Sequence, residues 1–600
     1  MAEHVQEVGA IEQSAARGGG FLFAPVGVRA FITPERFSEE QRQFFQTGHD
    51  FAVHEVLAQA DRLEQKDNGL LRQLLGKAGD LGLLSVDIGE AHGGLGLDKV
   101  TSMLVSESQA SYGSWATTFG AHTGIGTLPI VFFGTAAQKA KYLPDLATGR
   151  KVAAYALSEA GSGSDALGAK TVARLSADGK HYVVNGGKMW ITNGGFADVY
   201  VVFLKIDGDK FTALIVERGT PGFTQGREEH KLGIRGSSTT PLIFEDAKIP
   251  VENVLGEIGK GHKIAFNILN VGRLKLGAFT IGGMKWALEG GATYASERKQ
   301  FGKSISSFGL IREKLARAAA QTYALESMTY RAAGLIDGAI AVLDKDDPRY
   351  DAGVMHSIEE YVIEASIMKV AGSEWMFEII DEILQIHGGN GFVTDYPIER
   401  AYRDNRVNRI FEGTNEINRL LIPGTLFKRA LKGELPLLDA ASDLDAELAD
   451  PTLFPSPVGR LAAERRGAEM AKRQLLFAAR AAAMLGPELE QRQEVLAALA
   501  DVAIEVYAMD SMLGRTLAVD AGEATAPLRE ALCRFFCAES RERAAGRSRT
   551  ALCGTLPSEI LEEQLGLFER LHRFVPMNPV EAREVIAKAV LDQRGYPLPY

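Results

Sequence analysis

One carboxylate stands out in the stretch RVNRIFEGTNEINR, which covers residues 406 to 419 of this 600-residue chain. Glu412 lies between Phe411 and Gly413, shortly after a run rich in arginine. A carboxylate held in a dry pocket has its pKa raised towards ~6–7, where it can act as a general base at neutral pH. On the surface it would be an ordinary solvated glutamate, and the residues of this stretch alone favour that simpler interpretation.

Two further stretches place small and hydroxylated residues next to predicted turns. They are YALSEAGSGSD at residues 155 to 165 and WITNGG at residues 190 to 195. Glycine and serine let a backbone approach a ligand closely, but such stretches more often only connect elements. Their composition alone therefore leaves a ligand site as one of two alternatives.

Several familiar signatures are missing from the sequence. There is no GxxxxGK[ST] phosphate loop and no GxGxxG after a strand, and HEVLA at 54 to 58 lacks the second histidine of a zinc-binding HExxH. The spacing of Cys533 and Cys537 could place both on one helix face, but without histidine or further cysteine nearby it is more typical of packing than of metal binding. We expect no metal site.

The composition, 46% hydrophobic and 24% charged, is that of an ordinary globular protein. No window of about 18 apolar residues indicates a transmembrane helix. The net charge of -11 argues against nucleic-acid binding, which needs a concentrated basic face. Three sparse cysteines form no disulfide framework, and the first twenty residues lack the apolar stretch of a signal peptide, so a cytoplasmic protein is expected.

The order of elements that must position these residues predicts an α+β fold that is mostly α. We expect a flexible tail over 1–30, an N-terminal α domain over 31–150, a middle β domain over 151–255, a helical bundle over 256–437 and an additional helical domain over 438–600. Asn-Gly pairs at 185–186 and 193–194 predict hairpin-like turns in the β domain. Prolines at 436, 451, 455 and 457 predict a linker before the last domain.

Five motifs, taken in order, closely resemble the acyl-CoA dehydrogenase family: YALSEAGSGSD, MWITNGG, ERKQFGKSI, QIHGGNGF and RIFEGTNEI. The resemblance extends from residue 38 to residue 432, and the order α, β, α is that of the family's fold. The long C-terminal extension, with FGAHTGIG and FGTAAQKAKYLP, is most similar to the very-long-chain branch. The resemblance implies FAD-dependent α,β-dehydrogenation of a long-chain fatty acyl-CoA to a trans-2-enoyl-CoA, the first step of fatty acid β-oxidation.

The resemblance also assigns a role to Glu412, because in this family the acidic residue of the FEGT motif removes the α-proton of the thioester. FAD would accept the hydride from the β-carbon, with its flavin N5 opposite the base. The backbone amide of Glu412 and a ribityl hydroxyl of FAD would hydrogen-bond the thioester carbonyl, stabilising the enolate-like charge that develops as the proton leaves.

Correspondence with the family motifs predicts two sets of binding residues. Those expected to bind FAD are Tyr155, Leu157, Ser158, Gly163, Ser164, Trp190, Ile191, Thr192, Arg298, Phe301, Gln385, Gly388, Gly389, Thr414 and Glu416. Those expected to bind the substrate are Ser164, Asn270, Arg273, Phe411 and Gly413. In relatives, the residues matching Arg298 and QIHGG contact FAD across a subunit boundary, which implies a homodimer. The alternatives are a core position for Trp190 and, for Arg298, a surface ion pair with Glu297 or another acidic residue.

Three glycines, Gly120, Gly124 and Gly126, lie in a helical segment that resembles the pocket floor of long-chain relatives. They predict a preference for long chains, since each additional buried methylene contributes ~0.8 kcal/mol. The alternative is that these glycines serve helix packing.

The remaining expectations concern partners. The family implies an electron-transfer flavoprotein as the electron acceptor. The alternatives to a dehydrogenase are an acyl-CoA oxidase of the same fold and a scaffold protein with incidental dehydrogenase activity. The C-terminal extension is expected to pack as a further helical domain. A weaker alternative is peripheral attachment to the inner membrane through GRLAAERRGAEMAKRQLLFAARAAAMLG, because a basic helix with an apolar face can lie in an anionic interface.

Overall fold

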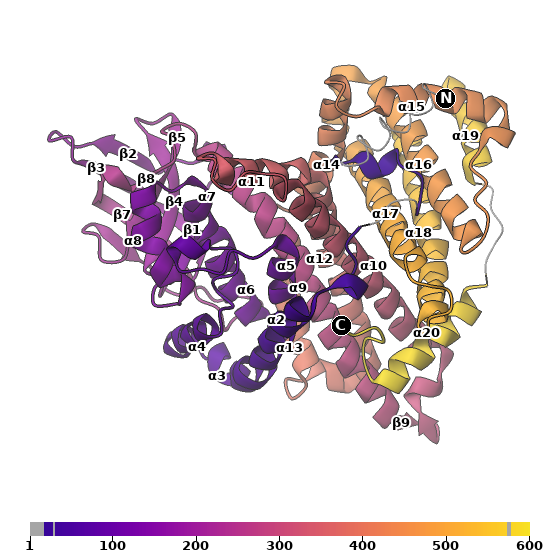
Figure 1. Cartoon of the computed structure of the whole chain (residues 1–600), viewed down its shortest axis with the longest axis horizontal. Helices are drawn as coiled ribbons and strands as arrows, with labels where there is room; N and C mark the ends of the chain where they lie inside the picture. Colours follow the sequence, from indigo (N-terminus) through magenta and orange to yellow (C-terminus); the bar gives the residue numbers. More distant parts are fainter. Residues whose placement is uncertain (1–16, 28–30, 573–577) are drawn as a thin grey trace.

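The computed structural model describes residues 17–27, 31–572 and 578–600. Figure 1 shows a β domain at one side of the molecule, long helices through its centre and a second helical bundle at the other side. This arrangement confirms the predicted α+β, mostly α class. Within the described ranges, no helix is both long and apolar enough to cross a membrane, and no cluster of three metal-ligating side chains occurs.

The N-terminal helices pack against the β domain and against α9 of the central bundle. α2 begins with a capping box, in which the Ser38 hydroxyl accepts from the Gln41 amide at 3.1 Å, and Thr135 and Gln138 start α8 in the same way. A π-helical turn, η6, joins α6 to α7. The elements are η1 (Gly20–Leu22), η2 (Pro34–Arg36), α2 (Glu39–Asp50), η3 (Phe51–Val56), η4 (Leu57–Gln59), α3 (Ala60–Glu64), α4 (Asn68–Asp80), η5 (Glu90–His92), α5 (Lys99–Ser108), α6 (Gly113–Gly120), η6 (Ala121–Gly126), α7 (Leu128–Phe133) and α8 (Ala136–Ala147).

The β domain contains one mixed sheet of eight strands in the order β6-β7-β3-β2-β4-β5-β8, with β1 beside β4. β1 and β2 run parallel to β4, and the other pairs are antiparallel. Its elements are β1 (Ala153–Ala156), η7 (Ala166–Gly168), β2 (Val172–Leu175), β3 (His181–Thr192), β4 (Val199–Ile206), β5 (Lys210–Glu217), β6 (Phe223–Gln225), β7 (Thr239–Pro250), η8 (Val251–Asn253) and β8 (Val254–Leu255).

The predicted hairpin turn at Asn185 and Gly186 was wrong. Both residues lie inside strand β3, where the register against β7 shifts between Val184 and Gly186. Gly186 has a φ of 138°, so the Asn-Gly pair produces a bulge within a long strand. The second pair does form a turn, because the Gly194 amide donates to the Ile191 carbonyl at 3.0 Å just after β3 ends.

The central bundle is built on α9, a helix of 37 residues whose small side chains allow close approach of its neighbours. A Cβ on Gly282 would lie 2.1 Å from the Glu107 carbonyl oxygen, so α5 and α9 can meet only because glycine stands there. The elements are α9 (Gly261–Glu297), β9 (Lys299–Gln300), β10 (Lys303–Ser304), η9 (Ile305–Ser307), α10 (Gly309–Ile340), α11 (Tyr350–Glu360), α12 (Val362–His387), η10 (Gly388–Phe392), α13 (Pro397–Asn405), η11 (Arg406–Arg409) and α14 (Asn415–Leu431).

The C-terminal extension forms a second helical bundle. Its elements are α15 (Leu437–Ala449), η12 (Pro451–Leu453), α16 (Ala462–Ala483), η13 (Gly486–Gln491), α17 (Gln493–Leu517), α18 (Ala526–Thr555), α19 (Ser558–His572) and α20 (Pro579–Gln593). Part of the predicted linker is in fact helix α15, whose Leu444 and Leu448 are buried. The structure does not support membrane attachment through α16, because its apolar face, including Leu475 and Phe477, is already buried inside the protein.

Residues 17–27, predicted as part of a flexible tail, are packed between the two bundles. The Gly19 amide donates to Glu364 of α12 at 2.7 Å, and the Val26 amide donates to Glu469 of α16 at 2.6 Å. Phe21 is 2% exposed and packs on Tyr507 of α17. The apolar residues after the glycine run therefore anchor this segment, and the prediction was wrong for this part. Residues 1–16 and 28–30 lie outside the described ranges.

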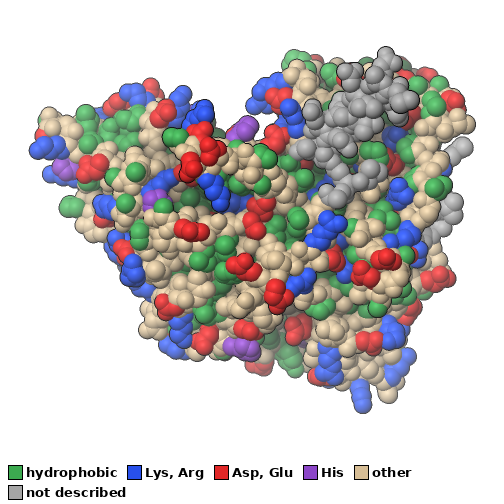
Figure 2. All heavy atoms as spheres, in the orientation of Figure 1, with side chains coloured by type: hydrophobic (Ala, Val, Ile, Leu, Met, Phe, Trp, Pro, Cys, Tyr) green, Lys and Arg blue, Asp and Glu red, His purple; other side chains and the backbone are tan. Residues whose placement is uncertain are grey.

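The last residues of the chain pack against α9. The ammonium of Lys285 lies 3.8 Å from the ring centroid of Tyr600 and pairs with Glu107 at 2.8 Å. The Tyr600 hydroxyl also donates to Glu107, at 2.8 Å. The C-terminus, marked near α9 in Figure 1, therefore contacts both α9 and α5. On the face drawn in Figure 2, the basic and acidic side chains of the described residues are interspersed.

Candidate active site

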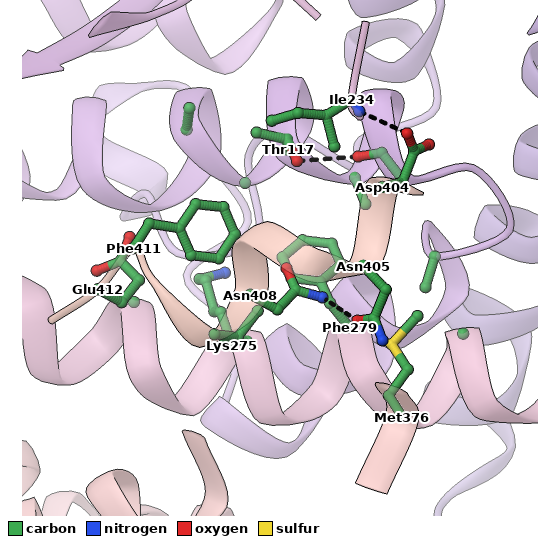
Figure 3. A pocket seen from close by; sticks show the side chains of 18 of the residues that line it. Thr117, Ile234, Lys275, Phe279, Met376, Asp404, Asn405, Asn408, Phe411 and Glu412 are labelled. Atoms are coloured by element: carbon green, nitrogen blue, oxygen red, sulfur yellow. Dashed lines mark hydrogen bonds between the residues drawn. The ribbon is translucent and has the colours of Figure 1, made fainter. Parts of the chain in front are cut away.

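A cavity of about 980 Å³, counting its open mouth, lies among the helices of the core. α6, η6, α9, α12 and the segment from α13 to Glu412 contribute its walls, and Thr192 reaches it from the end of β3. Figure 3 shows Glu412 and Phe411 at one side and Met376 at the other, with Phe279 and Asn408 between them. The base predicted from the FEGT motif therefore lies in a cavity and not on the surface.

The carboxyl group of Glu412 is largely shielded from water. Its Oε2 atom is buried without a hydrogen-bond partner among the described residues. Burial raises the pKa of Glu412 to about 7, although the positive charges of Arg273 and Lys369 lower it. Gly272 leaves the space for this carboxylate, because a Cβ there would lie 2.5 Å from Oε2. The pKa is therefore in the range that suits a general base at neutral pH.

The backbone around Glu412 is fixed by polar side chains from two helices. Glu412 has a φ of 58° and Gly413 a φ of 79°, a left-handed turn that needs support when its first residue carries a side chain. Arg273 Nε donates to the Glu412 carbonyl at 3.1 Å, while its Nη1 donates to Asn270 at 2.9 Å. Asn418 Nδ2 donates to the Gly413 carbonyl at 2.9 Å. Asn270 and Arg273 are both buried, and in this geometry they position the Glu412 turn.

Lys369 is a site residue that the sequence reasoning missed. It lies on α12, is fully buried, and donates from Nζ to Asn415 Oδ1 at 2.6 Å. Burial lowers its pKa to about 7, against the opposing effect of Glu412. A lysine in the apolar run VIEASIMKV was the available signal, because an unpaired ammonium is costly to bury and such positions are often functional.

The predicted flavin segments meet at the end of β3. The Met189 amide donates to the Ser158 carbonyl at 2.9 Å, which holds the two segments together. Trp190 is 58% exposed with a φ of 63°, so the alternative of a core tryptophan is wrong. Thr192 lines the cavity with Glu412.

The other members of these segments divide between core and surface. Leu157 and Ile191 are buried, whereas Gly163 and Ser164 are exposed. Tyr155 points into the core, where its hydroxyl donates to the Ala265 carbonyl of α9 at 3.3 Å.

A second group of predicted cofactor residues lies on a separate surface. At about 1.5 Å per residue, roughly 40 Å of α9 separate Gly272 from Arg298. The ring of Tyr294 stacks on His387 at 4.1 Å, which brings the end of α9 against the QIHGG segment. Arg298, Phe301, Gln385, Gly388 and Gly389 are all exposed there, Phe301 by 91%.

The alternative ion pair for Arg298 is not formed. Its guanidinium makes no ion pair within the part of the chain that the structure describes, and Glu297 instead pairs with Arg594 at 3.3 Å. Thr414 caps α14 by accepting from the Ile417 amide at 3.3 Å, and Glu416 is exposed in the first turn of that helix.

The far end of the cavity was not predicted. Its apolar walls include Phe279, Trp286 and Met376, and its polar residues include Asn405 and Asn408. The segment RDNRVN, which carries these two asparagines, is continuous with the FEGT motif, but its residue types alone do not indicate which side chains enter a cavity.

Comparison with known families accounts for most of the chain. The N-terminal, middle and C-terminal domains of acyl-CoA dehydrogenases match residues 38–150, 154–247 and 259–426, and a further acyl-CoA dehydrogenase C-terminal domain matches residues 469–568. The chain belongs to the acyl-CoA dehydrogenase family. The members of this family are FAD-dependent oxidoreductases, so the resemblance inferred from the five motifs is confirmed.

Individual relatives cover almost the whole length of this acyl-CoA dehydrogenase. A probable acyl-CoA dehydrogenase of Bacillus subtilis is 46% identical over 585 residues, covering 97% of this chain and 98% of the relative. The human mitochondrial very long-chain specific acyl-CoA dehydrogenase is 35% identical over 557 residues, covering 86% of this chain and 81% of the relative. A crystal structure of a Bacillus anthracis acyl-CoA dehydrogenase complexed with FAD superposes with a TM-score of 0.94 at 47% identity, covering 97% of this chain and all of that one.

Proposed function

We propose that this acyl-CoA dehydrogenase converts long-chain fatty acyl-CoA to trans-2-enoyl-CoA, the first step of fatty acid β-oxidation, with Glu412 as the base. The observation that carries the proposal is the buried carboxyl group of Glu412. Its Oε2 has no hydrogen-bond partner within the described ranges, and burial raises its pKa to about 7. Because Thr192 of β3 lines the same cavity, an acyl chain beside the base would also lie next to the predicted flavin segments.

In this proposal the residues of the chain hold the substrate and move one proton. The α-proton passes from the acyl carbon to Oε2 of Glu412, and the nearby charges of Arg273 and Lys369 stabilise the carboxylate beforehand. The amide of Glu412, fixed by its left-handed turn, donates to the thioester carbonyl and stabilises the charge that develops there. FAD, when bound, supplies the acceptor for the hydride that leaves the β-carbon.

The residues around β3 fit a flavin. Trp190 presents an exposed ring, Ser158 and Thr192 offer hydroxyls, and glycines 161 and 163 have open space where a Cβ would lie. These features suit a flat cofactor that approaches the backbone closely.

We assign Arg298, Phe301, Gln385, Gly388 and Gly389 to the FAD of a partner subunit in a homodimer. Roughly 40 Å of helix separate this exposed surface from the Glu412 site, at about 1.5 Å per residue. The guanidinium of Arg298, free of ion pairs with the described residues, suits a cofactor phosphate.

A preference for long chains is supported by the shape of the cavity. Gly120 and Gly124 line it, and bulky side chains at these positions would fill part of its volume. Similarity to the human very long-chain enzyme supports the same preference. We propose that an electron-transfer flavoprotein accepts the electrons from the reduced FAD. The alternative is an oxidase of the same fold, which passes them to oxygen.

Anaerobic titration of the purified yellow protein tests the proposal. Butyryl-, octanoyl-, palmitoyl- and stearoyl-CoA are added in turn, and bleaching of the flavin absorbance is followed. The proposal predicts the fastest bleaching with the two longest chains, and no bleaching by any of the four would overturn it. Reoxidation in air, compared with reoxidation by an electron-transfer flavoprotein, separates the dehydrogenase from the oxidase.

A further inference from the structure

The end of the cavity near Met376 contains a polar group that a plain alkyl chain would not satisfy. Asn405 lines the cavity and is 2% exposed, and its Nδ2 has no hydrogen-bond partner among the described residues. Its Oδ1 accepts from Asn408 Nδ2 at 2.7 Å, so the pair is fixed with the remaining donor unpaired. Figure 3 shows both asparagines on the far side of Phe411 from Glu412, with Asn405 next to Met376.

Other polar side chains that line this cavity already have partners inside the protein. The Thr117 hydroxyl donates to the Gly113 carbonyl at 2.9 Å, and the Ser111 hydroxyl donates to the Ala52 carbonyl at 3.3 Å. Lys275 pairs with Asp87 at 2.9 Å. Asn405 differs from these three residues, because it lines the cavity while its buried Nδ2 donor has no partner among the described residues.

Leaving a buried amide donor unpaired destabilises the folded protein, because the donor has lost its hydrogen bonds to water without gaining another partner. An acyl cavity that served only hydrocarbon chains would avoid this cost by placing leucine or phenylalanine at such a position. Apolar side chains, including Phe279, Met376 and Ile380, line the same cavity and can pack on methylene groups. The arrangement therefore resembles a mainly apolar pocket with one placed donor, which is the usual form of a site that discriminates between ligands by a single polar group.

We propose that Asn405 donates a hydrogen bond to an oxygen carried on the acyl chain, away from the thioester. The substrates of this enzyme then include fatty acyl-CoAs with a carbonyl, hydroxyl or ether oxygen in the distal part of the chain. The inference rests on the proposed function and narrows the substrate class of the same cavity. The competing occupant of the Asn405 donor is an ordered water molecule.

The test compares palmitoyl-CoA with a series of keto-palmitoyl-CoAs in which one carbonyl is moved along the distal half of the chain. kcat/KM is measured for each with the full-length, FAD-loaded enzyme. We expect one carbonyl position to give a higher kcat/KM than the neighbouring positions. Asn405→Leu should lower the ratio of this kcat/KM to that of palmitoyl-CoA by roughly two- to tenfold, which is the effect of losing one neutral hydrogen bond. Asn405→Ala gives the same comparison if the leucine variant does not fold.

Two controls separate this effect from general damage to the cavity. Thr117→Val removes a hydroxyl that lines the same cavity but already has an internal partner, so the preferred carbonyl position should not change. Calorimetric binding of the same esters to Glu412→Gln should show the same preference in Kd without turnover. Hydroxy- and ether-substituted chains then identify which kind of oxygen is bound best.

Failure of this inference differs from failure of the proposed function. If no chain at all is dehydrogenated, the proposed function is wrong. If palmitoyl-CoA is turned over but no carbonyl position is preferred, and Asn405→Leu changes all esters equally, the oxygen-binding role is overturned and the amide is bound by water.

Discussion

The surroundings of Glu412 suit the proton transfer that we propose for it. Burial raises the pKa of Glu412, and Gly272 leaves space for its carboxylate. The positive charges of Arg273 and Lys369 oppose this rise in the pKa. Without Arg273 and Lys369 the group would stay protonated to still higher pH and would be a poorer base at neutral pH. With them, the carboxyl group has a pKa of about 7.

This pKa predicts how flavin reduction depends on pH. Glu412 must be ionised to accept a proton, so the reduction rate should rise with pH through about 7 and level off above it. Below that pH the rate should fall by about tenfold per unit, because the ionised fraction falls by that factor. Stopped-flow reduction by palmitoyl-CoA measures this, with substrate affinity at each pH as the control. A rate that is constant through this range would contradict the assignment.

At this scale the sequence indicated the candidate base but not its environment. Glu412 was predictable because its motif is contiguous. Its pKa depends on Gly272 and Arg273 of α9 and on Lys369 of α12, which are distant in sequence. Asn405 was missed for a similar reason, since only the tertiary structure shows that it lines the cavity and that its buried Nδ2 has no partner among the described residues.

At the scale of elements, the segment from α6 through η6 forms a wall of the cavity that contains Glu412. A Cβ on Gly124 would lie 3.4 Å from Lys275 Cδ, an ordinary contact, so larger side chains can be accommodated there at the expense of the cavity. We predict that Gly124→Met moves the optimum of kcat/KM towards shorter acyl chains, because each methylene that loses its burial loses ~0.8 kcal/mol.

Gly126 provides a contrasting variant on the same segment. It is not among the residues that line the cavity, and a Cβ there would lie 2.8 Å from the Cβ of Ala153 in β1. Gly126→Ala should lower the thermal stability while leaving the chain-length profile in place. An unchanged profile in Gly124→Met would show that this wall does not set the chain length.

Elements were predicted best where the pattern was long and regular. The order of helical and β-rich segments was right because it follows from hydrophobic periodicity. The hairpin turn predicted at Asn185 and Gly186 was wrong because an Asn-Gly pair suits a bulge as well as a turn. Only the pairing of β3 with β7 decides between the two. The prolines around α15 suggested a linker, yet Leu444 and Leu448 find a buried surface to pack on.

At the scale of the whole molecule, segments distant in sequence pack together. Residues 17–27 bind α12 and α16, and Tyr600 packs on Lys285 of α9. Neither contact could be predicted from local patterns, because each depends on a surface built by other parts of the chain. The exposed surface around Arg298 and Phe301 is what the proposed homodimer would cover.

The homodimer makes a prediction for Arg298. Arg298→Ala should weaken FAD retention by about 1.5–3 kcal/mol, because a charged donor to the cofactor phosphate is lost. Flavin content after extensive dialysis is the measurement, and Lys299→Ala, which changes a neighbouring exposed cation, is the control. Full retention of flavin by the arginine variant, or flavin bound by a protein with the mass of one chain, would contradict a site shared between subunits.

Glu412 is the residue on which the proposed mechanism depends most, and Glu412→Gln tests its role most directly. The amide keeps nearly the shape of the carboxylate but cannot accept a proton, so FAD and acyl-CoA should still bind. The measurement is the anaerobic rate of flavin bleaching by palmitoyl-CoA in the variant and the wild type, with flavin content as the control. We predict that the variant binds FAD and loses nearly all bleaching. A rate close to that of the wild type would place the base elsewhere and contradict the mechanism.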